Sequence, residues 1–246
     1  MAIGDIDEQF QRTQLLIGDE ALKKLMYSHV IVFGVGGVGG YVCEALVRAG
    51  IGAIDIVDND SINVSNLNRQ IIALHSTIGI DKVDAISERL LDINPGLLIN
   101  KHKCFYLPDT RSEFDFGKFD YVIDCIDTIT AKLDLAEAAA SSGTPIISSM
   151  GTGNKLHPEM LEISDIYKTE MDPLSRVMRR ELKKRGVKAL KVVYSKEQPL
   201  KANAGDKDGD RRKAVPGSIS FVPPVAGFII AGEVVRDLIK NDISLN

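Results

Sequence analysis

The feature that most constrains the fold is a glycine-rich turn between an apolar run and a helical pattern. The run His29–Phe33, HVIVF, is β-branched and aromatic, which is typical of a strand buried on both faces of a parallel sheet. The turn GVGGVGG follows, and residues 38–49 have helical spacing that Gly50 ends. A strand, a tight glycine turn and a helix in this order predict a nucleotide-binding unit.

The spacing of the glycines supports this prediction. In a Gly-x-Gly-x-x-Gly turn, the first glycine permits the bend, the second lets a phosphate approach the backbone, and the third lets helix and strand pack closely. Free N–H groups and the positive end of the dipole at the helix start attract phosphates. We therefore assign four glycines to nucleotide binding: Gly34, Gly36, Gly37 and Gly39. NAD, FAD, S-adenosylmethionine and ATP all use such a turn, so the motif alone does not choose among them.

The rest of the chain predicts an α/β protein with a Rossmann-like, doubly wound, mainly parallel sheet. Strands are expected at 29–33, 53–58, 97–103, 121–127 and 145–150, with helices at 38–49, 81–95 and 130–143. After Gly151 the regular alternation of strands and helices ends. Strands are expected at 161–167 and 190–195, helices at 172–186 and 225–241, and a polar loop at 201–217. We expect an ATP-binding domain at 1–150 and a smaller α+β extension at 151–246 that completes the site and faces the substrate.

Composition limits the possible partners and sites. The net charge of −4 means that any surface for nucleic acid must be local. The cysteines, Cys43, Cys104 and Cys125, form no Cys-x-x-Cys pair, which argues against zinc and against a disulfide framework and favours a reducing cytoplasm. The N-terminus lacks signal-peptide character. The apolar stretch 219–231 is short for a membrane span, so we expect a buried helix and no stable membrane insertion.

A polar cluster follows the second predicted strand. Asp58 ends that strand, where a carboxylate can bind ribose hydroxyls. Ligands of open parallel sheets bind outside the carboxyl ends of the strands, where this cluster lies. We assign to nucleotide binding Asp58, Asp60, Asn66, Asn68, Arg69, Gln70 and Lys82.

Charge in this cluster favours ATP over NAD. Arg69 and Lys82 suit a triphosphate, because both can stabilise negative charge when an α-phosphate is attacked and pyrophosphate leaves. Asp127 lies at another strand end, where its carboxylate can hold Mg²⁺ together with phosphate oxygens. We therefore name Arg69, Lys82 and Asp127 as catalytic candidates.

Separated motifs carry a resemblance to a known family. GVGGVGG, DNDSINVSNLNRQ, DKVDA and DCIDT occur in the order found in the adenylating domain of ubiquitin-activating enzymes and of the bacterial enzymes that activate sulfur-carrier proteins. The likeness spans residues 15–150 and implies activation of a carboxylate by ATP·Mg²⁺ as an acyl-adenylate. It implies that Asp58 holds the ribose, that Arg69 and Lys82 contact phosphates, and that Asp127 serves Mg²⁺. It also implies a homodimer in which an N-terminal arginine, Arg12 here, reaches the partner's ATP.

The second half departs from the sulfur-carrier activators. Those enzymes usually carry two Cys-x-x-Cys pairs for zinc, whereas this chain has no cysteine after Cys125, so no late cysteine can form a thioester. The segments from SSMGTGNKLHPEM onward and GSISFVPPVAGFIIAGEVVRDLI instead resemble tRNA threonylcarbamoyladenosine dehydratases. That resemblance implies an ATP-dependent cyclisation of the modified adenosine beside the anticodon, and a sulfur-relay partner of the cysteine desulfurase system. Cys125 itself is interpreted as a structural residue within a buried strand.

A basic segment is the candidate surface for RNA. Glu181 is the only acid between Arg176 and Lys191, so the segment forms a local positive patch in an acidic protein. The candidates for RNA contact are Arg176, Arg179, Arg180, Lys183, Lys184, Arg185 and Lys188. The loop residues Lys207, Arg211, Arg212 and Lys213 form a second candidate group.

Three alternatives remain open at the level of sequence. The first is adenylation of the C-terminus of a ubiquitin-like sulfur carrier, which keeps the site and changes the substrate. The second is a NAD-dependent oxidoreductase, which leaves Arg69, Lys82 and Asp127 without a role. The third is an adaptor that binds ATP without turning it over.

Overall fold

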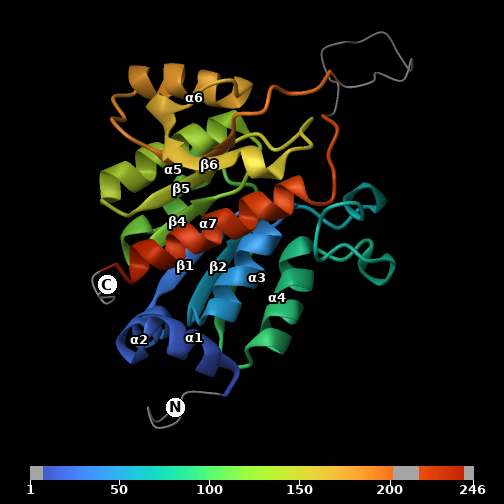
Figure 1. Cartoon of the computed structure of the whole chain (residues 1–246), viewed down its shortest axis with the longest axis vertical. Coiled ribbons are helices and arrows are strands. Elements are labelled where there is room, and N and C mark those ends of the chain that lie inside the picture. Colours follow the sequence, from blue (N-terminus) through green and yellow to red (C-terminus); the bar gives the residue numbers. More distant parts are fainter. Residues whose placement is uncertain (1–7, 202–215, 241–246) are drawn as a thin grey trace.

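The computed structural model describes residues 8–201 and 216–240 (Figure 1). One seven-stranded sheet runs in the order β3-β2-β1-β4-β5-β7-β6. Its strands are β1 His29–Phe33, β2 Ala53–Val57, β3 Leu98–His102, β4 Tyr121–Asp124, β5 Ile146–Ser149, β6 Leu161–Asp165 and β7 Lys191–Ser195. Neighbouring strands pair in parallel except β6, which pairs antiparallel with β7 at the edge. The predicted doubly wound, mainly parallel sheet is confirmed.

Helices cover both faces of the sheet. They are α1 Gln11–Ile17, α2 Asp19–Tyr27, α3 Gly39–Ala49, α4 Lys82–Ile93, α5 Ile129–Ser142, α6 Pro173–Lys184 and α7 Val222–Leu238. In Figure 1, α3, α4 and α7 lie in front of the sheet, whereas α5 and α6 lie behind it and along its upper edge. Two layers of helices around a parallel sheet bury both of its faces.

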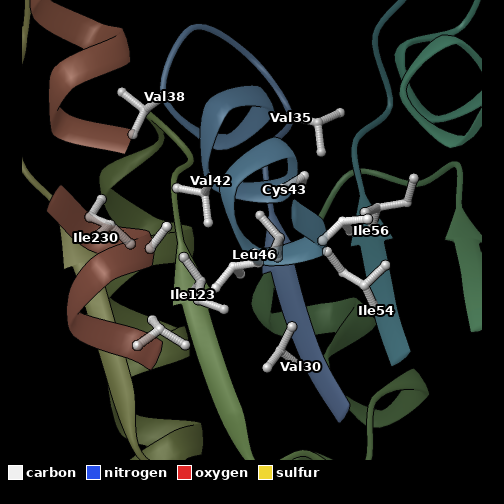
Figure 2. Close-up of a cluster of buried hydrophobic side chains, with 14 of the residues drawn as sticks. Val30, Val35, Val38, Val42, Cys43, Leu46, Ile54, Ile56, Ile123 and Ile230 are labelled. Carbon is white, nitrogen blue, oxygen red and sulfur yellow. The ribbon is translucent and has the colours of Figure 1, made fainter. Parts of the chain in front are cut away.

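The side chains of β1 alternate between the two cores. Val30 and Val32 belong to the cluster shared with α3 and α7, while Ile31 and Phe33 belong to the cluster shared with α5. Figure 2 shows the first cluster, in which Val30 lies near residues of α3 and of neighbouring strands. The strand is therefore buried on both faces, as its apolar composition predicted.

The C-terminal part extends the same sheet and the same core. β7 pairs with β5, and α7 packs across α3 (Figures 1 and 2). Gly227 permits this approach, because a Cβ there would lie 2.6 Å from the Val38 carbonyl oxygen. The domain boundary at residue 150 stays a prediction, since the described residues on both sides of it share one sheet.

Two predicted helices have shifted ends. α7 begins at Val222 rather than near Val225, because prolines are tolerated in the first turn of a helix, where their missing N–H has no partner to lose. In α6, Asp172 is the N-cap as predicted, but the helix ends at Lys184 and Gly186 follows with φ of +74°. In the part of the chain that the structure describes, no helix is both long and apolar enough to cross a membrane. Most of the predicted loop 201–217 lies outside the described residues.

Candidate active site

A cavity of about 420 Å³ lies where the strand order reverses, beside the carboxyl ends of β1, β2 and β4. The chain leaves β1 toward β2 on one side and later returns to β4 on the other, and such a switch point is the usual ligand site of an open parallel sheet. The predicted residues that line the cavity are Gly34, Gly36, Gly37, Asp58, Asp60, Asn66, Arg69, Gln70, Lys82 and Asp127. The fold therefore brings together residues that are scattered over the first half of the chain.

The glycine turn forms one wall of the cavity. Gly34 has φ of +85°, and a Cβ there would lie 3.0 Å from the Cys125 carbonyl group. A Cβ at Gly39 would lie 1.8 Å from the Gly34 carbonyl oxygen, so Gly39 serves close packing inside the turn and does not line the cavity. Gly36 and Gly37 line it without such crowding, and their lack of side chains leaves backbone N–H groups accessible to a phosphate.

Asp58 is hydrogen-bonded to this turn. Its carboxylate accepts hydrogen bonds from the backbone N–H of Val35 at 2.9 Å and of Asp60 at 2.9 Å. Lys82, at the start of α4, is only 6% exposed, and its Nζ lies 2.7 Å from Asp60 Oδ2 and 3.6 Å from Asp58 Oδ1. An ammonium carries three N–H donors, so Lys82 can donate to a ligand in the cavity as well as to Asp60.

Arg69 reaches the cavity from the loop after β2. Its Nη1 donates to the Ser65 carbonyl at 2.9 Å and to Asn68 Oδ1 at 2.9 Å. Asn66 lines the cavity and also stabilises the loop, because its side chain accepts from the Asn63 N–H. Asn68 does not line the cavity; its Nδ2 donates to the Ser218 carbonyl at 3.1 Å.

Gln70 carries an atom that needs a partner. Its Oε1 is the one buried side-chain oxygen without a hydrogen-bond partner among the described residues. Leaving such an oxygen unpaired costs about 1–3 kcal/mol. Other atoms of Gln70 line the cavity, so a reorientation of its amide would bring this oxygen to a ligand that donates a hydrogen bond. This atom and the open glycine turn both fit a ligand with donor groups and phosphates, such as ATP.

Asp127 lies beyond the end of β4 with little to hold its carboxylate. It is exposed, and its contact in the described chain is a long hydrogen bond from Thr128 Oγ1 at 3.5 Å. A carboxylate with free oxygens at the edge of this cavity suits Mg²⁺, which takes carboxylate and phosphate oxygens together. Among the described residues, no group of three or more His, Cys, Asp or Glu side chains is placed to hold a metal by itself.

The placement of Cys125 within a buried strand was wrong. β4 ends at Asp124, opposite Phe33, because β1 also ends there, and the Cys125 N–H makes a last bond to the Phe33 carbonyl at 2.8 Å. Cys125 therefore sits in the turn that lines the cavity. Burial, and then the neighbouring charge of Asp124, raise the pKa of the Cys125 thiol well above that of a free cysteine. The thiol is protonated at neutral pH and is a poor nucleophile.

Several lining residues were missed by the sequence reasoning. Phe105 and Tyr106 follow β3 and line the cavity. They could have been predicted, because ligands of open parallel sheets bind at the carboxyl ends of the strands. Thr152 follows β5 and could have been predicted for the same reason. Ser218 and Pro223 precede and begin α7, and nothing local in the sequence placed them beside a glycine turn so far away.

Two buried ion pairs near the cavity were not predicted from the sequence. Lys132 Nζ lies 3.0 Å from Asp124 Oδ2, with both side chains 1% exposed. Lys155 Nζ lies 3.0 Å from Asp172 Oδ1, with side chains 1% and 2% exposed. A lysine inside the apolar pattern of α5 was the available signal for the first pair, because such a lysine must find a partner.

Two predicted groups lie outside this cavity. Arg12 is exposed on α1, and its assignment to the site of a partner subunit stays a prediction. The basic residues lie on and after α6 along the upper edge in Figure 1. Helix α6 precedes β7, which is parallel to β5. The helix therefore begins near the carboxyl ends of the parallel strands, where the cavity lies, and runs toward their amino ends.

The basic residues of α6 differ in their surroundings. Arg179 donates to the Thr169 carbonyl at 2.8 Å and is partly buried, so its charge has a structural partner. Lys184 and Arg180 contact Glu181, and Arg185 contacts Glu137 at 2.6 Å. The other predicted members, Arg176, Lys183 and Lys188, are exposed. RNA contact by this surface stays a prediction, and Lys207, Arg211, Arg212 and Lys213 lie outside the described residues.

Comparison with known proteins decides the family. The sequence profile of the ThiF family matches residues 9–245. The chain belongs to the ThiF family. It is 44% identical over 243 residues to a Bacillus subtilis protein named tRNA threonylcarbamoyladenosine dehydratase, and the match covers 95% of each chain. An Escherichia coli protein of the same name is 36% identical, over 72% of this chain and 66% of its own length.

A solved structure extends this likeness to the fold. The E. coli tRNA N6-threonylcarbamoyladenosine dehydratase in complex with ATP superimposes with a TM-score of 0.89 at 29% identity, covering 100% of both chains. The described part of this chain therefore shares the fold of that protein.

Proposed function

We propose that this chain catalyses the ATP-dependent dehydration of threonylcarbamoyladenosine in tRNA, next to the anticodon. The observation that carries the proposal is the cavity that gathers Arg69, Lys82 and Asp127 around an open glycine turn. The name of a Bacillus relative of nearly the same length and the ATP complex of a structural relative support it.

The residues that line the cavity suggest how ATP would lie in it. Its phosphates would lie on the N–H groups of the Gly36–Gly37 turn, and its ribose beside Asp58. Asp127 would hold Mg²⁺ together with phosphate oxygens, and the ion would neutralise part of their charge. Phe105 and Tyr106 give the cavity an apolar wall on the side of β3.

The first chemical step is adenylation. An oxygen of the threonyl carboxylate attacks the α-phosphorus of ATP, a new O–P bond forms, and the bond to pyrophosphate breaks. Arg69 and Lys82 stabilise the negative charge that builds up on the phosphate oxygens during this exchange. Lys82 lines the same cavity as the glycine turn, where its ammonium can donate to a phosphate oxygen.

The second step closes the ring without a protein nucleophile. An internal nucleophile of the same side chain attacks the activated carbonyl carbon and displaces AMP, so that one water is lost overall. A tethered group has a high effective concentration, and the enzyme needs only to hold it and exclude water. The protonated Cys125 thiol is in keeping with this, because it is not poised to form a thioester.

The proposal includes partners and a location. The enzyme acts in the cytoplasm as a homodimer, with Arg12 reaching the partner's ATP. The exposed basic residues of α6 hold tRNA phosphates, and a cysteine desulfurase system is a further protein partner. These points rest on the family resemblance and on the exposure of the residues concerned.

Mass analysis of tRNA nucleosides tests the proposal. Transfer RNA that carries threonylcarbamoyladenosine is incubated with ATP, Mg²⁺ and the protein, then digested. We expect the modified nucleoside to lose the mass of one water while AMP and pyrophosphate appear, and Arg69→Ala to show neither. An unchanged nucleoside would contradict the proposal. Formation of AMP only with a carrier protein that ends in Gly-Gly would favour the sulfur-carrier alternative instead.

A further inference from the structure

One exposed amide joins the nucleotide loop to the C-terminal part of the chain. Asn68 Nδ2 donates to the Ser218 carbonyl at 3.1 Å, across 150 positions of sequence. The other end of the same amide, Oδ1, accepts from Arg69 Nη1 at 2.9 Å. Asn68 therefore stands between a backbone carbonyl that only accepts hydrogen bonds and a guanidinium that only donates them.

This position fixes the chemistry required at residue 68. An amide offers a donor and an acceptor on one rigid plane, whereas a carboxylate lacks the donor and an alanine lacks both. The contact with Ser218 sets the plane of the Asn68 amide, and the amide then sets where Arg69 points. The Ser65 carbonyl takes a second bond from Arg69 Nη1. In the described chain, Nε and Nη2 of Arg69 have no protein acceptor and remain available to a phosphate in the cavity.

The residue before Ser218 is bonded to a loop that is distant in sequence. The Asn154 N–H donates to the Gly217 carbonyl at 2.8 Å, and Asn154 Oδ1 accepts from the Gly217 N–H at 2.6 Å. Asn154 adopts φ of +58°, a left-handed conformation that asparagine tolerates better than most residues. The loop after β5 thus fixes the segment that contacts Asn68.

A buried ion pair supports that loop. Lys155 Nζ donates to the Gly151 carbonyl at 2.6 Å and to Asp172 Oδ1 at 3.0 Å. Thr152, within the same loop, lines the cavity together with Ser218. A continuous series of contacts therefore leads from the second half of the chain to the guanidinium of Arg69.

We infer that Asn68 is a positioning residue for Arg69, and that it makes the placement of this arginine depend on the Gly217–Ser218 segment. Asn68 does not touch the cavity, so it acts through Arg69 rather than on the ligand. The inference rests on the proposed function, in which Arg69 binds the phosphates of ATP. It adds that the second half of the chain, which carries the candidate substrate surface, also orients the catalytic arginine.

A double-mutant cycle on ATP binding tests the inference. Binding of labelled ATP with Mg²⁺ is measured by equilibrium dialysis for the wild type, Asn68→Ala, Arg69→Ala and the double variant. We expect Asn68→Ala to weaken binding about 5-fold, the usual scale of one lost hydrogen bond. In the Arg69→Ala background the same change is expected to have no further effect, because the group that it positions is absent.

Two further variants sharpen the cycle. Asn68→Asp keeps the shape but cannot donate to the Ser218 carbonyl, so we expect it to bind ATP more weakly than the wild type. Asn154→Gly keeps the left-handed backbone and removes only the side-chain bond to Gly217, so a weakening of about 2-fold is expected. Both effects should vanish when Arg69 is alanine.

Asn94→Ala is the matched control, because it removes an exposed side-chain bond to the Gly96 N–H outside the cavity. It should bind ATP as the wild type does, and all variants should keep the wild-type melting temperature. Unchanged ATP binding by Asn68→Ala, or an equal loss in the Arg69→Ala background, would overturn the inference. If the wild type binds ATP but does not dehydrate tRNA, the proposed reaction fails while the cycle still decides the role of Asn68. Absence of ATP binding by the wild type would overturn both.

Discussion

Two groups of buried polar side chains lie near the same edge of the sheet and differ in how fully they are paired. Beneath the turn after β4, Lys132 Nζ donates to Asp124 at 3.0 Å, to Ser148 at 3.2 Å and to the Ser149 carbonyl at 2.7 Å. In the wall of the neighbouring cavity, Gln70 Oε1 is buried and has no partner in the described chain. Fully paired buried groups support the fold, whereas an unpaired one in a cavity marks a place for a ligand.

The two buried lysines illustrate the difference. Lys132 has its acceptors within the protein, and Asp124 also accepts from the Ile126 N–H, so this pair fixes the turn that leads to Asp127. Lys82 lies at the cavity wall and shares its charge with Asp58 and with the exposed Asp60. The first lysine is therefore expected to matter for stability and the second for ligand binding.

Removing Lys132 should produce the largest effect on stability. Lys132→Ala leaves the buried Asp124 carboxylate unpaired, which costs about 3–5 kcal/mol of unfolding free energy. Urea unfolding measures this loss. The control is Lys101→Ala, which breaks an ion pair with Asp84 whose side chains are 47% and 48% exposed, and should cost at most about 1 kcal/mol. Equal unfolding midpoints for the two variants would mean that the buried network does not support the fold.

Removing Arg69 should lower turnover and leave stability nearly unchanged, the reverse of what is expected for Lys132. Arg69→Ala is expected to lower turnover about 10²–10³-fold, the usual loss when a group that stabilises transition-state charge is deleted. Its urea midpoint should stay near the wild-type value, because the bonds that it loses are on the surface of a loop. Lys82→Ala is expected to lower turnover in the same way. Full turnover by either variant would remove that residue from the mechanism.

Neutralising exposed charges on α6 extends the comparison to a third region. Replacing Arg180, Lys183 and Lys184 with glutamine should weaken tRNA binding and lower the slope of log affinity against log salt by up to about 3. Arg179 is left in place because it bonds to Thr169. Filter binding at several salt concentrations measures the slope. The same affinity for tRNA before and after the change would identify this surface as a solvated helix face.

Replacing Cys125 should have the smallest effect. Because burial raises the pKa of its thiol, the thiolate fraction becomes appreciable only at a higher pH than for a free cysteine. Cys125→Ala should therefore change turnover by no more than about 2-fold. In the native protein its alkylation by iodoacetamide at mildly alkaline pH should be slow, and it should speed up in urea. A loss of turnover comparable with that of Arg69→Ala would instead give the thiol a catalytic role.

Much of the site could be predicted from the sequence. A strand, a glycine turn and a helix are local patterns, and the rule that ligands bind at strand carboxyl ends then places Asp58, Arg69 and Asp127 near the turn. These predictions worked because parallel strands align their carboxyl ends whatever the order of the strands. The end of β4 was misplaced by a few residues because the length of β1, not the composition of residues 125–127, decides where pairing stops.

Only the tertiary structure decided the partners that are distant in sequence. That Ser218 meets Asn68 follows from α7 crossing α3, which depends on the close approach at Gly227. That Lys132 meets Asp124 and Ser148 follows from the packing of α5 over two neighbouring strands. Local periodicity and turn chemistry thus determined the helices and strands and the residues that follow the carboxyl ends of the strands. Burial and packing between distant elements determined which polar groups are paired within the protein and which remain for a ligand.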